Sequence, residues 1–151
     1  MRHFASIAEL AKAAGEELGQ SEWVEVSQEM IDRFAEATGD FQWIHVDHER
    51  AKASPFGGTV AHGYLTLALA PRLMSQIYQV DNIRLRINYG SNKVRFPSPV
   101  KSGSRVRLHL KLLSVDPTPK GARVVTEATI EIEGAKRPAC LAELVAVLVP
   151  A

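Results

Sequence analysis

The sequence predicts an α+β fold in which an antiparallel sheet covers one buried helix, and two observations carry this prediction. Segment 60–78 is apolar around nearly its whole circumference, which is typical of a helix buried on most sides. Four runs with strand-like patterns follow it and are joined by short turns, so neighbouring strands are expected to be antiparallel. The apolar face of such a sheet needs a cover, and the helix has the length and polarity to provide it. A sheet wrapped around one central helix is the hotdog architecture, although periodicity alone does not select that topology.

Capping and breaking residues divide the chain into elements. Ser6 and Ser27 are placed to begin helices, and Gly39 is placed to end the second one. Pro71 lies inside the long apolar helix and is expected to kink it or to break its hydrogen bonding locally. The expected elements are helices at 7–14, 28–38, 48–53 and 60–78, and strands at 21–26, 83–96 with a bend at Gly90, 106–112, 122–133 and 141–149. In the first long strand one face carries Ile83, Leu85, Ile87 and Tyr89, and this apolar face is the one the helix is expected to cover.

Length and composition exclude several classes of protein. The 151 residues predict one domain spanning 1–151, and a net charge of +1 without a dense basic run predicts no nucleic-acid partner. No window approaches the roughly 20 apolar residues of a membrane helix, so no membrane partner is expected either. Cys140 is the single cysteine, which excludes an internal disulfide, and it is interpreted as a small buried hydrophobic residue. The amino-terminal segment lacks the long apolar core of a signal peptide, so a cytoplasmic location is expected.

The residues best suited to chemistry lie in segment 37–47. Asp40 and His45 are five residues apart in the sequence DFQWIH, whose large apolar side chains favour burial and would keep the polar pair partly dry. Under those conditions the pKa values of a carboxyl and an imidazole can be adjusted for proton transfer. Spacing alone also fits a turn or capping aspartate beside a structural histidine. A metal site that adds Asp47 and His48 is a further alternative, but no dedicated ligand spacing is present and we expect no metal.

Several motifs together resemble the hydratase-2 signature of MaoC-like dehydratases, a family that includes R-specific enoyl-CoA hydratases. They are TGDFQWIH at 38–45, PFG at 55–57 and AHG at 61–63, where the apolar helix opens. The later sequences NYGSNKVRFP at 88–97 and VKSG at 100–103 resemble the strand and turn that follow the helix in this family. The resemblance covers most of the chain from Trp23 onward. It points to the NodN-like branch, which often keeps Gln-Trp-Ile-His where better-known hydratases have Asn-Pro-Leu-His, and it implies the hotdog fold.

The resemblance implies a lyase that adds water to trans-2-enoyl-CoA to give R-3-hydroxyacyl-CoA, or that catalyses the reverse dehydration. Asp40 and His45 would hold and activate one water, which attacks the β-carbon while a proton returns to the α-carbon on the same face. Gly63 would offer its backbone N–H to the thioester oxygen, because a helix amino terminus has unpaired donors and a partial positive charge. Close packing of the helix is the other interpretation of Gly63. No cofactor is expected, since the CoA thioester is itself the substrate.

Two residues of the motif depart from the wider family, which usually has Asn and Pro at the positions of Gln42 and Trp43. Gln42 could still orient the loop through hydrogen bonds, although its side chain is longer. Trp43 would either narrow the acyl pocket or pack in the core. His62 is interpreted as structural rather than catalytic, as part of the entry into the helix.

Polar residues on the first long strand are further candidates for binding substrate. Asn88 and Asn92 flank the expected bend and would either line the site or serve the turn. Lys93 and Arg95 could meet the phosphates of CoA, or they could form an ordinary solvated surface.

Two other functions remain open at this stage. In a hotdog thioesterase a carboxylate would activate water to attack the thioester carbon, and a non-catalytic protein would bind acyl thioesters without turnover. In each case the expected partner is an acyl-CoA or acyl-carrier thioester, which belongs to fatty acid metabolism. A homodimer is also expected, because hotdog domains usually pair their sheets edge to edge.

Overall fold

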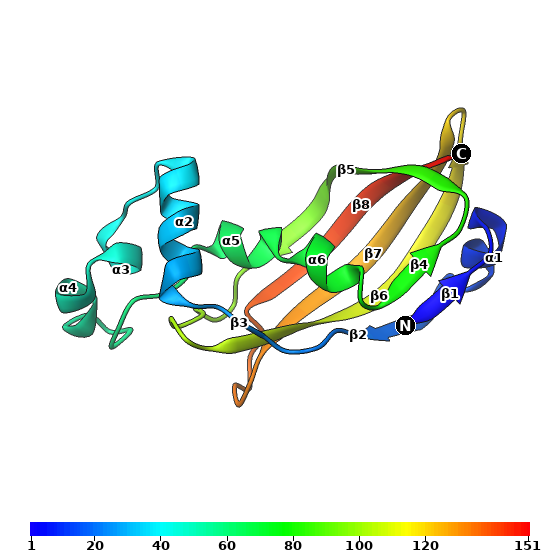
Figure 1. The fold of residues 1–151 in the computed structure, drawn as a ribbon. Helices are drawn as coiled ribbons and strands as arrows, with labels where there is room; N and C mark the ends of the chain where they lie inside the picture. Colours follow the sequence, from blue (N-terminus) through cyan, green and yellow to red (C-terminus); the bar gives the residue numbers. More distant parts are fainter.

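A computed structural model describes residues 1–151, and its main feature is a strongly curved antiparallel sheet (Figure 1). Its strand order is β2-β6-β7-β8-β5, and β3 also pairs with β6. The six strands are β2 (Glu17–Gln20), β3 (Val24–Glu25), β5 (Ile83–Arg95), β6 (Arg105–Thr118), β7 (Gly121–Ile132) and β8 (Cys140–Pro150). A separate parallel pair joins β1 (Arg2–Phe4) to β4 (Tyr78–Val80). The predicted α+β hotdog architecture is confirmed, whereas β1, β2 and β4 were not predicted.

The central helix crosses the concave face of the sheet in two segments, α5 (Gly63–Ala68) and α6 (Ala70–Met74). The chain is interrupted at Leu69, and Pro71 lies within the first turn of α6, where its missing N–H costs least. The predicted local break is therefore confirmed, but the helix is shorter than the expected 60–78. Leu65, Leu69 and Leu73 are buried in one cluster with apolar residues of β6, β7 and β8, so this helix fills the centre of the core.

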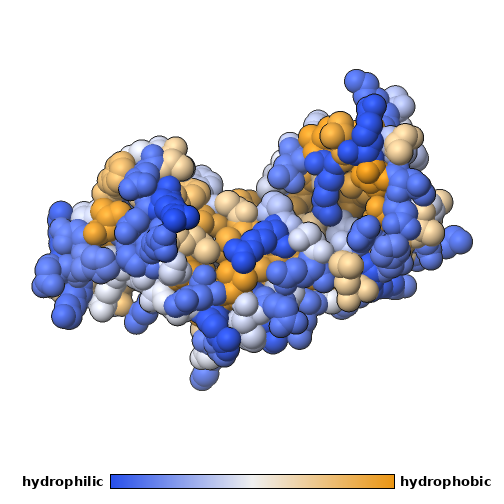
Figure 2. Space-filling model, viewed as in Figure 1, coloured by the Kyte–Doolittle hydropathy of each residue, from blue (hydrophilic) through white to orange (hydrophobic).

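The helices before the central helix begin and end at the expected signals. The Ser27 hydroxyl accepts a hydrogen bond from the Met30 N–H at the start of α2, and Gly39 ends α2 with a left-handed φ of 77°. Four helices precede the centre of the fold: α1 (Ile7–Lys12), α2 (Gln28–Thr38), α3 (Trp43–Val46) and α4 (His48–Lys52). Helices α2, α3 and α4 form an arm beyond the end of the sheet, and the space-filling view shows a hollow with hydrophobic side chains between this arm and the sheet (Figure 2).

The prediction for the covered face of β5 is wrong. Leu85, Ile87 and Tyr89 are 49%, 45% and 65% exposed, while Arg86 and Asn88 line the cavity beneath the central helix. Alternation defines two faces of a strand but does not say which one turns inward. The register with β8 shifts between Asn88 and Gly90, which matches the predicted bend. Only one edge of β5 is paired, so its other edge carries free backbone donors and acceptors.

Two simpler expectations can also be compared with the structure. Cys140 is buried in the core as predicted, and this burial raises the pKa of its thiol to about 11. None of the helices combines the length and the hydrophobicity that crossing a bilayer would require.

Candidate active site

Asp40 follows the left-handed turn at Gly39, which ends α2 and directs the chain back toward the central helix. Its carboxylate accepts a hydrogen bond of 3.3 Å from the Gln42 N–H, and its own N–H donates to the Thr38 hydroxyl at 3.4 Å. Such local hydrogen bonds are typical of an aspartate after a helix end, and they fix the backbone of the turn. The carboxylate itself stays on the exposed side of the chain.

His45 lies in α3 and is only 6% exposed. Its Nδ1 is 2.6 Å from the carbonyl oxygen of Val60. Because a carbonyl can only accept, Nδ1 must carry the hydrogen, and the lone pair of Nε2 is left to accept a proton. Burial lowers the pKa of His45, and His62 lowers it further, while the Val60 carbonyl and Asp40 act in the opposite direction. The imidazole is therefore neutral at pH 7 and able to act as a base.

The support for His45 comes from a residue that the sequence analysis did not single out. The Gln28 side chain in α2 donates to the carbonyl of His45 at 2.9 Å and accepts from the Thr59 hydroxyl at 2.6 Å. The Val60 N–H in turn donates to the carbonyl of Ile44 at 3.0 Å. These bonds tie α2, α3 and the segment before the central helix together. No motif marked Gln28, because its role depends on contacts between segments far apart in the sequence.

His62 lies at the centre of this arrangement, 2% exposed and immediately before α5. Its ring stacks on that of His45 with centroids 3.8 Å apart, and it contacts the ring of Phe34 at 4.8 Å. Its Nε2 donates to the backbone carbonyl of Asp40 at 3.0 Å, so it joins the two ends of the motif. The structural interpretation of His62 agrees with these contacts, but they also make it a positioning residue for both Asp40 and His45.

Asp40, His45 and His62 converge on one small volume. One polar side-chain atom from each lies within 4.8 Å of the others. A carboxylate and an imidazole at such a separation can share one water as a common hydrogen-bond partner. The expected dry surroundings are only partly present, because the histidines are buried whereas Asp40 and Phe41 are exposed.

The same three side chains are the set that could hold a metal ion. Asp47, which the sequence suggested as a further ligand, instead caps α4 by accepting a hydrogen bond from the Arg50 N–H at 3.0 Å. His45 Nδ1 and His62 Nε2 already bond to backbone carbonyls, so only the other nitrogen of each ring is available to a metal ion. The proposed metal ligands Asp47 and His48 are thus not part of the cluster.

Gly63 is the first residue of α5, so its N–H has no intrahelical partner. A Cβ built at this position would lie 2.9 Å from the ring of Phe96, closer than real Cβ contacts. Close packing therefore favours glycine here, and the free N–H next to His62 also agrees with a role in binding the thioester oxygen. The two interpretations of Gly63 are compatible.

The other candidates for binding substrate are scattered. The Gln42 N–H contacts Asp40, whereas Trp43 is half-buried and its ring lies 4.3 Å from the guanidinium of Arg50. Along β5, the Asn92 side chain donates to Glu143 at 2.8 Å, and the exposed Arg95 donates to the carbonyl of Val94. Lys93 is exposed, and Asn88 is the member of this group that lines the large cavity described below.

The fold and the site define a MaoC-like hotdog protein, and comparison with known proteins assigns the chain to that family. The model of the MaoC like domain matches residues 9–135. The chain therefore belongs to the MaoC-like family, as the sequence motifs predicted.

Individual relatives agree with this assignment. The chain is 56% identical over 144 residues to 3-hydroxyacyl-thioester dehydratase Z of Mycobacterium tuberculosis (strain ATCC 25618 / H37Rv), with 95% of each chain covered. It is 45% identical to nodulation protein N of Rhizobium leguminosarum bv. viciae, covering 97% of this chain and 92% of that protein. The unliganded R-hydratase PhaJ1 from Pseudomonas aeruginosa has the same fold, with a TM-score of 0.77, 23% identity and coverage of 98% and 88%. The predicted enzyme class, a hydratase or dehydratase of the MaoC-like type, is confirmed.

Proposed function

We propose that the protein reversibly adds water to trans-2-enoyl thioesters to give R-3-hydroxyacyl thioesters, with Asp40 and His45 as the catalytic residues. The observation that carries the proposal is the convergence of Asp40 and His45 beside the start of α5, where they can hold one water. The 56% identity to a 3-hydroxyacyl-thioester dehydratase over 95% of both chains supports the same reaction.

Each group has a role in the proposed reaction. The water oxygen bonds to the β-carbon while one of its protons passes to the Asp40–His45 pair, for which His45 Nε2 is a ready acceptor. The π electrons of the double bond move toward the α-carbon and the thioester oxygen, and a proton from the same pair then bonds to the α-carbon. The Gly63 N–H stabilises the charge that develops on the thioester oxygen, a contribution of about 3–4 kcal/mol for one well-placed donor. No cofactor or metal takes part in this scheme.

An assay with crotonyl-CoA distinguishes this function from the two alternatives. A hydratase removes the conjugated double bond without releasing thiol, a thioesterase releases free CoA, and a binding protein does neither. We expect loss of the enoyl absorbance and formation of the R-3-hydroxy product. Free thiol as the main product, or no turnover with any enoyl-CoA of a chain-length series, would contradict the proposal.

Variants with matched controls test the two catalytic residues. Asp40→Asn and His45→Gln should each reduce kcat about 10²- to 10⁴-fold while the variant proteins remain folded. His48→Gln and Asp116→Asn replace exposed residues of the same types away from the site and should leave kcat unchanged. Rates like those of the wild type in both purified site variants would refute the assignment. Activity that survives extensive chelation, with no metal detected by mass spectrometry, would support the scheme without a metal.

We also propose that the protein forms a homodimer through the free edge of β5. This edge has unpaired backbone groups and lies beside the exposed apolar residues Leu85, Ile87 and Tyr89. Light scattering should give the mass of two chains, and Ile87→Lys should shift the mass toward one chain. A wild-type mass of a single chain would contradict the dimer. The cytoplasm and fatty acid metabolism remain the expected setting.

A further inference from the structure

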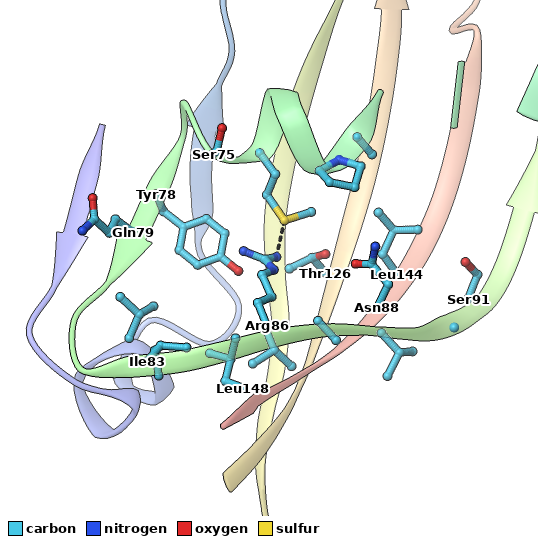
Figure 3. Close-up of a pocket in the computed structure, with 18 of the residues that line it drawn as sticks. Ser75, Tyr78, Gln79, Ile83, Arg86, Asn88, Ser91, Thr126, Leu144 and Leu148 are labelled. Carbon is cyan, nitrogen blue, oxygen red and sulfur yellow. Dashed lines mark hydrogen bonds between the residues drawn. The ribbon is translucent and has the colours of Figure 1, made fainter. Parts of the chain in front are cut away.

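A cavity of about 660 Å³ lies between the central helix and the strands β5 and β8 (Figure 3). Its walls are mostly apolar, with side chains from α5, α6, β4, β5, β7 and β8. It is large enough to take a small-molecule chain, since ligand pockets usually measure roughly 300–1,000 Å³.

The cavity lies on the same face of the central helix as Gly63. Gly63, Leu67, Pro71 and Met74 follow one another at spacings of three or four residues, which places them on one side of a helix. Leu67, Pro71 and Met74 line the cavity. The helical path is continuous across the break, because the Leu69 N–H bonds to Leu65 and the Leu73 N–H bonds to Leu69. Met74 therefore lies about 16 Å beyond Gly63 along the axis, and an acyl chain with its thioester at Gly63 can extend toward Met74.

The far end of this cavity carries a buried polar group, the hydroxyl of Tyr78, whose proton has no acceptor. Tyr78 is 3% exposed, and its hydroxyl oxygen is buried without a hydrogen-bond partner of good geometry. Burial raises the pKa of Tyr78, and the adjacent Arg86 offsets only part of this rise, so the phenol stays protonated. A guanidinium can only donate, so even beside Arg86 the phenol proton has no acceptor.

Arg86 is the second polar group at this end. Its side chain extends from β5 into the cavity, where Figure 3 shows its guanidinium beside Tyr78. The guanidinium carbon lies 5.1 Å from the centre of the Tyr78 ring, and one nitrogen contacts the sulfur of Met74, a weak acceptor. No carboxylate pairs with Arg86, and none of the residues that line the cavity is acidic. Other arginines of the chain, such as Arg105 and Arg107, do have carboxylate partners.

We propose that Arg86 and Tyr78 bind a carboxylate at the distal end of the acyl chain, so that the enzyme prefers ω-carboxylated enoyl thioesters. This inference rests on the proposed hydratase function and names the substrate class of that same site. A guanidinium and a phenol supply several donors to an anion, and hydrogen bonds to a charged acceptor are roughly twice as strong as neutral ones. Gly63 does not line the cavity, so the methylene chain would pass from Gly63 to the apolar walls that begin at Leu67 and reach Met74. A carboxylate would give the Arg86 guanidinium a charged partner and the Tyr78 hydroxyl an acceptor for its proton, whereas a methyl end would supply neither.

The test compares trans-2-decenoyl-CoA with the CoA monothioester of trans-2-decenedioic acid, which differs only at the end of the chain, with crotonyl-CoA as the short reference. The wild-type enzyme should have the higher kcat/KM for the carboxylated substrate. Arg86→Met should lower that value about 10- to 100-fold, and Tyr78→Phe about 3- to 10-fold. Turnover of crotonyl-CoA should not change, because the short chain does not reach this end. Arg86→Lys keeps the charge and should restore part of the preference.

Arg84→Met is the matched control, since Arg84 is exposed on the same strand, as Arg86 is, but does not line the cavity. It should leave the ratio between the two long substrates unchanged. Equal losses on both long substrates in Arg86→Met, an unchanged ratio, or dissociation of the oligomer on light scattering would overturn the proposal. If the wild type hydrates crotonyl-CoA but shows no preference at the distal end, this inference fails while the hydratase function stands. If no enoyl-CoA is hydrated, both fail.

Discussion

Replacing Gly63 with Ala tests how the start of the central helix is packed against β5 and the segment that follows it. The added Cβ would lie 2.9 Å from one atom of the Phe96 ring and 3.0 and 3.1 Å from two others. All three atoms belong to a side chain rather than to the backbone. Relief of the clash therefore requires the ring of Phe96 or the start of α5 to move.

The size of the effect follows from how freely the Phe96 ring can move. Overpacking a well-filled site usually costs about 1–3 kcal/mol. Phe96 is 41% exposed, so its ring can swing toward solvent, and we expect a cost of about 1 kcal/mol, near the lower limit. In a chain of this length that corresponds to a fall in Tm of about 2–4 °C. Alanine keeps the backbone N–H at position 63, but a shift of α5 would move this N–H away from the thioester oxygen. The kcat of the folded variant should therefore fall as well.

A double variant separates packing from catalysis. Thermal unfolding and crotonyl-CoA kinetics would be measured for Gly63→Ala, Phe96→Leu and the two combined. The smaller Leu side chain should relieve the clash, so the double variant should recover most of the Tm and part of the kcat lost in Gly63→Ala. If Gly63→Ala keeps the wild-type Tm and kcat, or if Phe96→Leu fails to reduce its loss, the packing argument is wrong.

Two further predictions concern the histidines. Because burial lowers the pKa of His45 and its neutral form is the base, kcat/KM should fall with decreasing pH only below the usual histidine pKa of about 6.5. The unfolded chain binds this proton more readily than the folded chain, so the free energy of unfolding should also decrease as pH falls below about 6.5, and His45→Gln should flatten this part of the stability curve. A pH profile of kcat/KM with its acidic limb well above 6.5 would contradict the lowered pKa. His62→Gln keeps a donor for the Asp40 carbonyl but loses the stacking on His45, so kcat should fall about tenfold with little change in KM. A large rise in KM with unchanged kcat would instead show that His62 acts on substrate binding.

The architecture could be predicted from the sequence because its main signals are local. The near-continuous apolar character of 60–78 and the alternation in β6 and β7 report burial directly, and the caps at Ser27 and Gly39 depend only on neighbouring residues. The covered face of β5 could not be predicted in this way. Its apolar side chains face away from the helix, and the proposed dimer contact would explain why apolar residues stand on that face.

A motif predicted the two catalytic candidates, but the contacts that hold them in place could not be predicted from the sequence. Asp40 and His45 lie in one short segment, so their proximity could be inferred from spacing. The contributions of Gln28 and His62 depend on hydrogen bonds that join α2, α3 and α5 across 17 and 22 residues. Arg86 was not singled out, because no local signal distinguishes an arginine that points into a cavity from one that points to solvent.

The sharing of one water by Asp40 and His45 is tested most directly by combining Asp40→Asn with His45→Gln and measuring kcat for hydration of crotonyl-CoA. Groups that act on the same water lose their joint contribution when either one is removed, so the double variant should be about as slow as the slower single variant. If the two losses multiply instead, the residues act independently and the account of the site is contradicted.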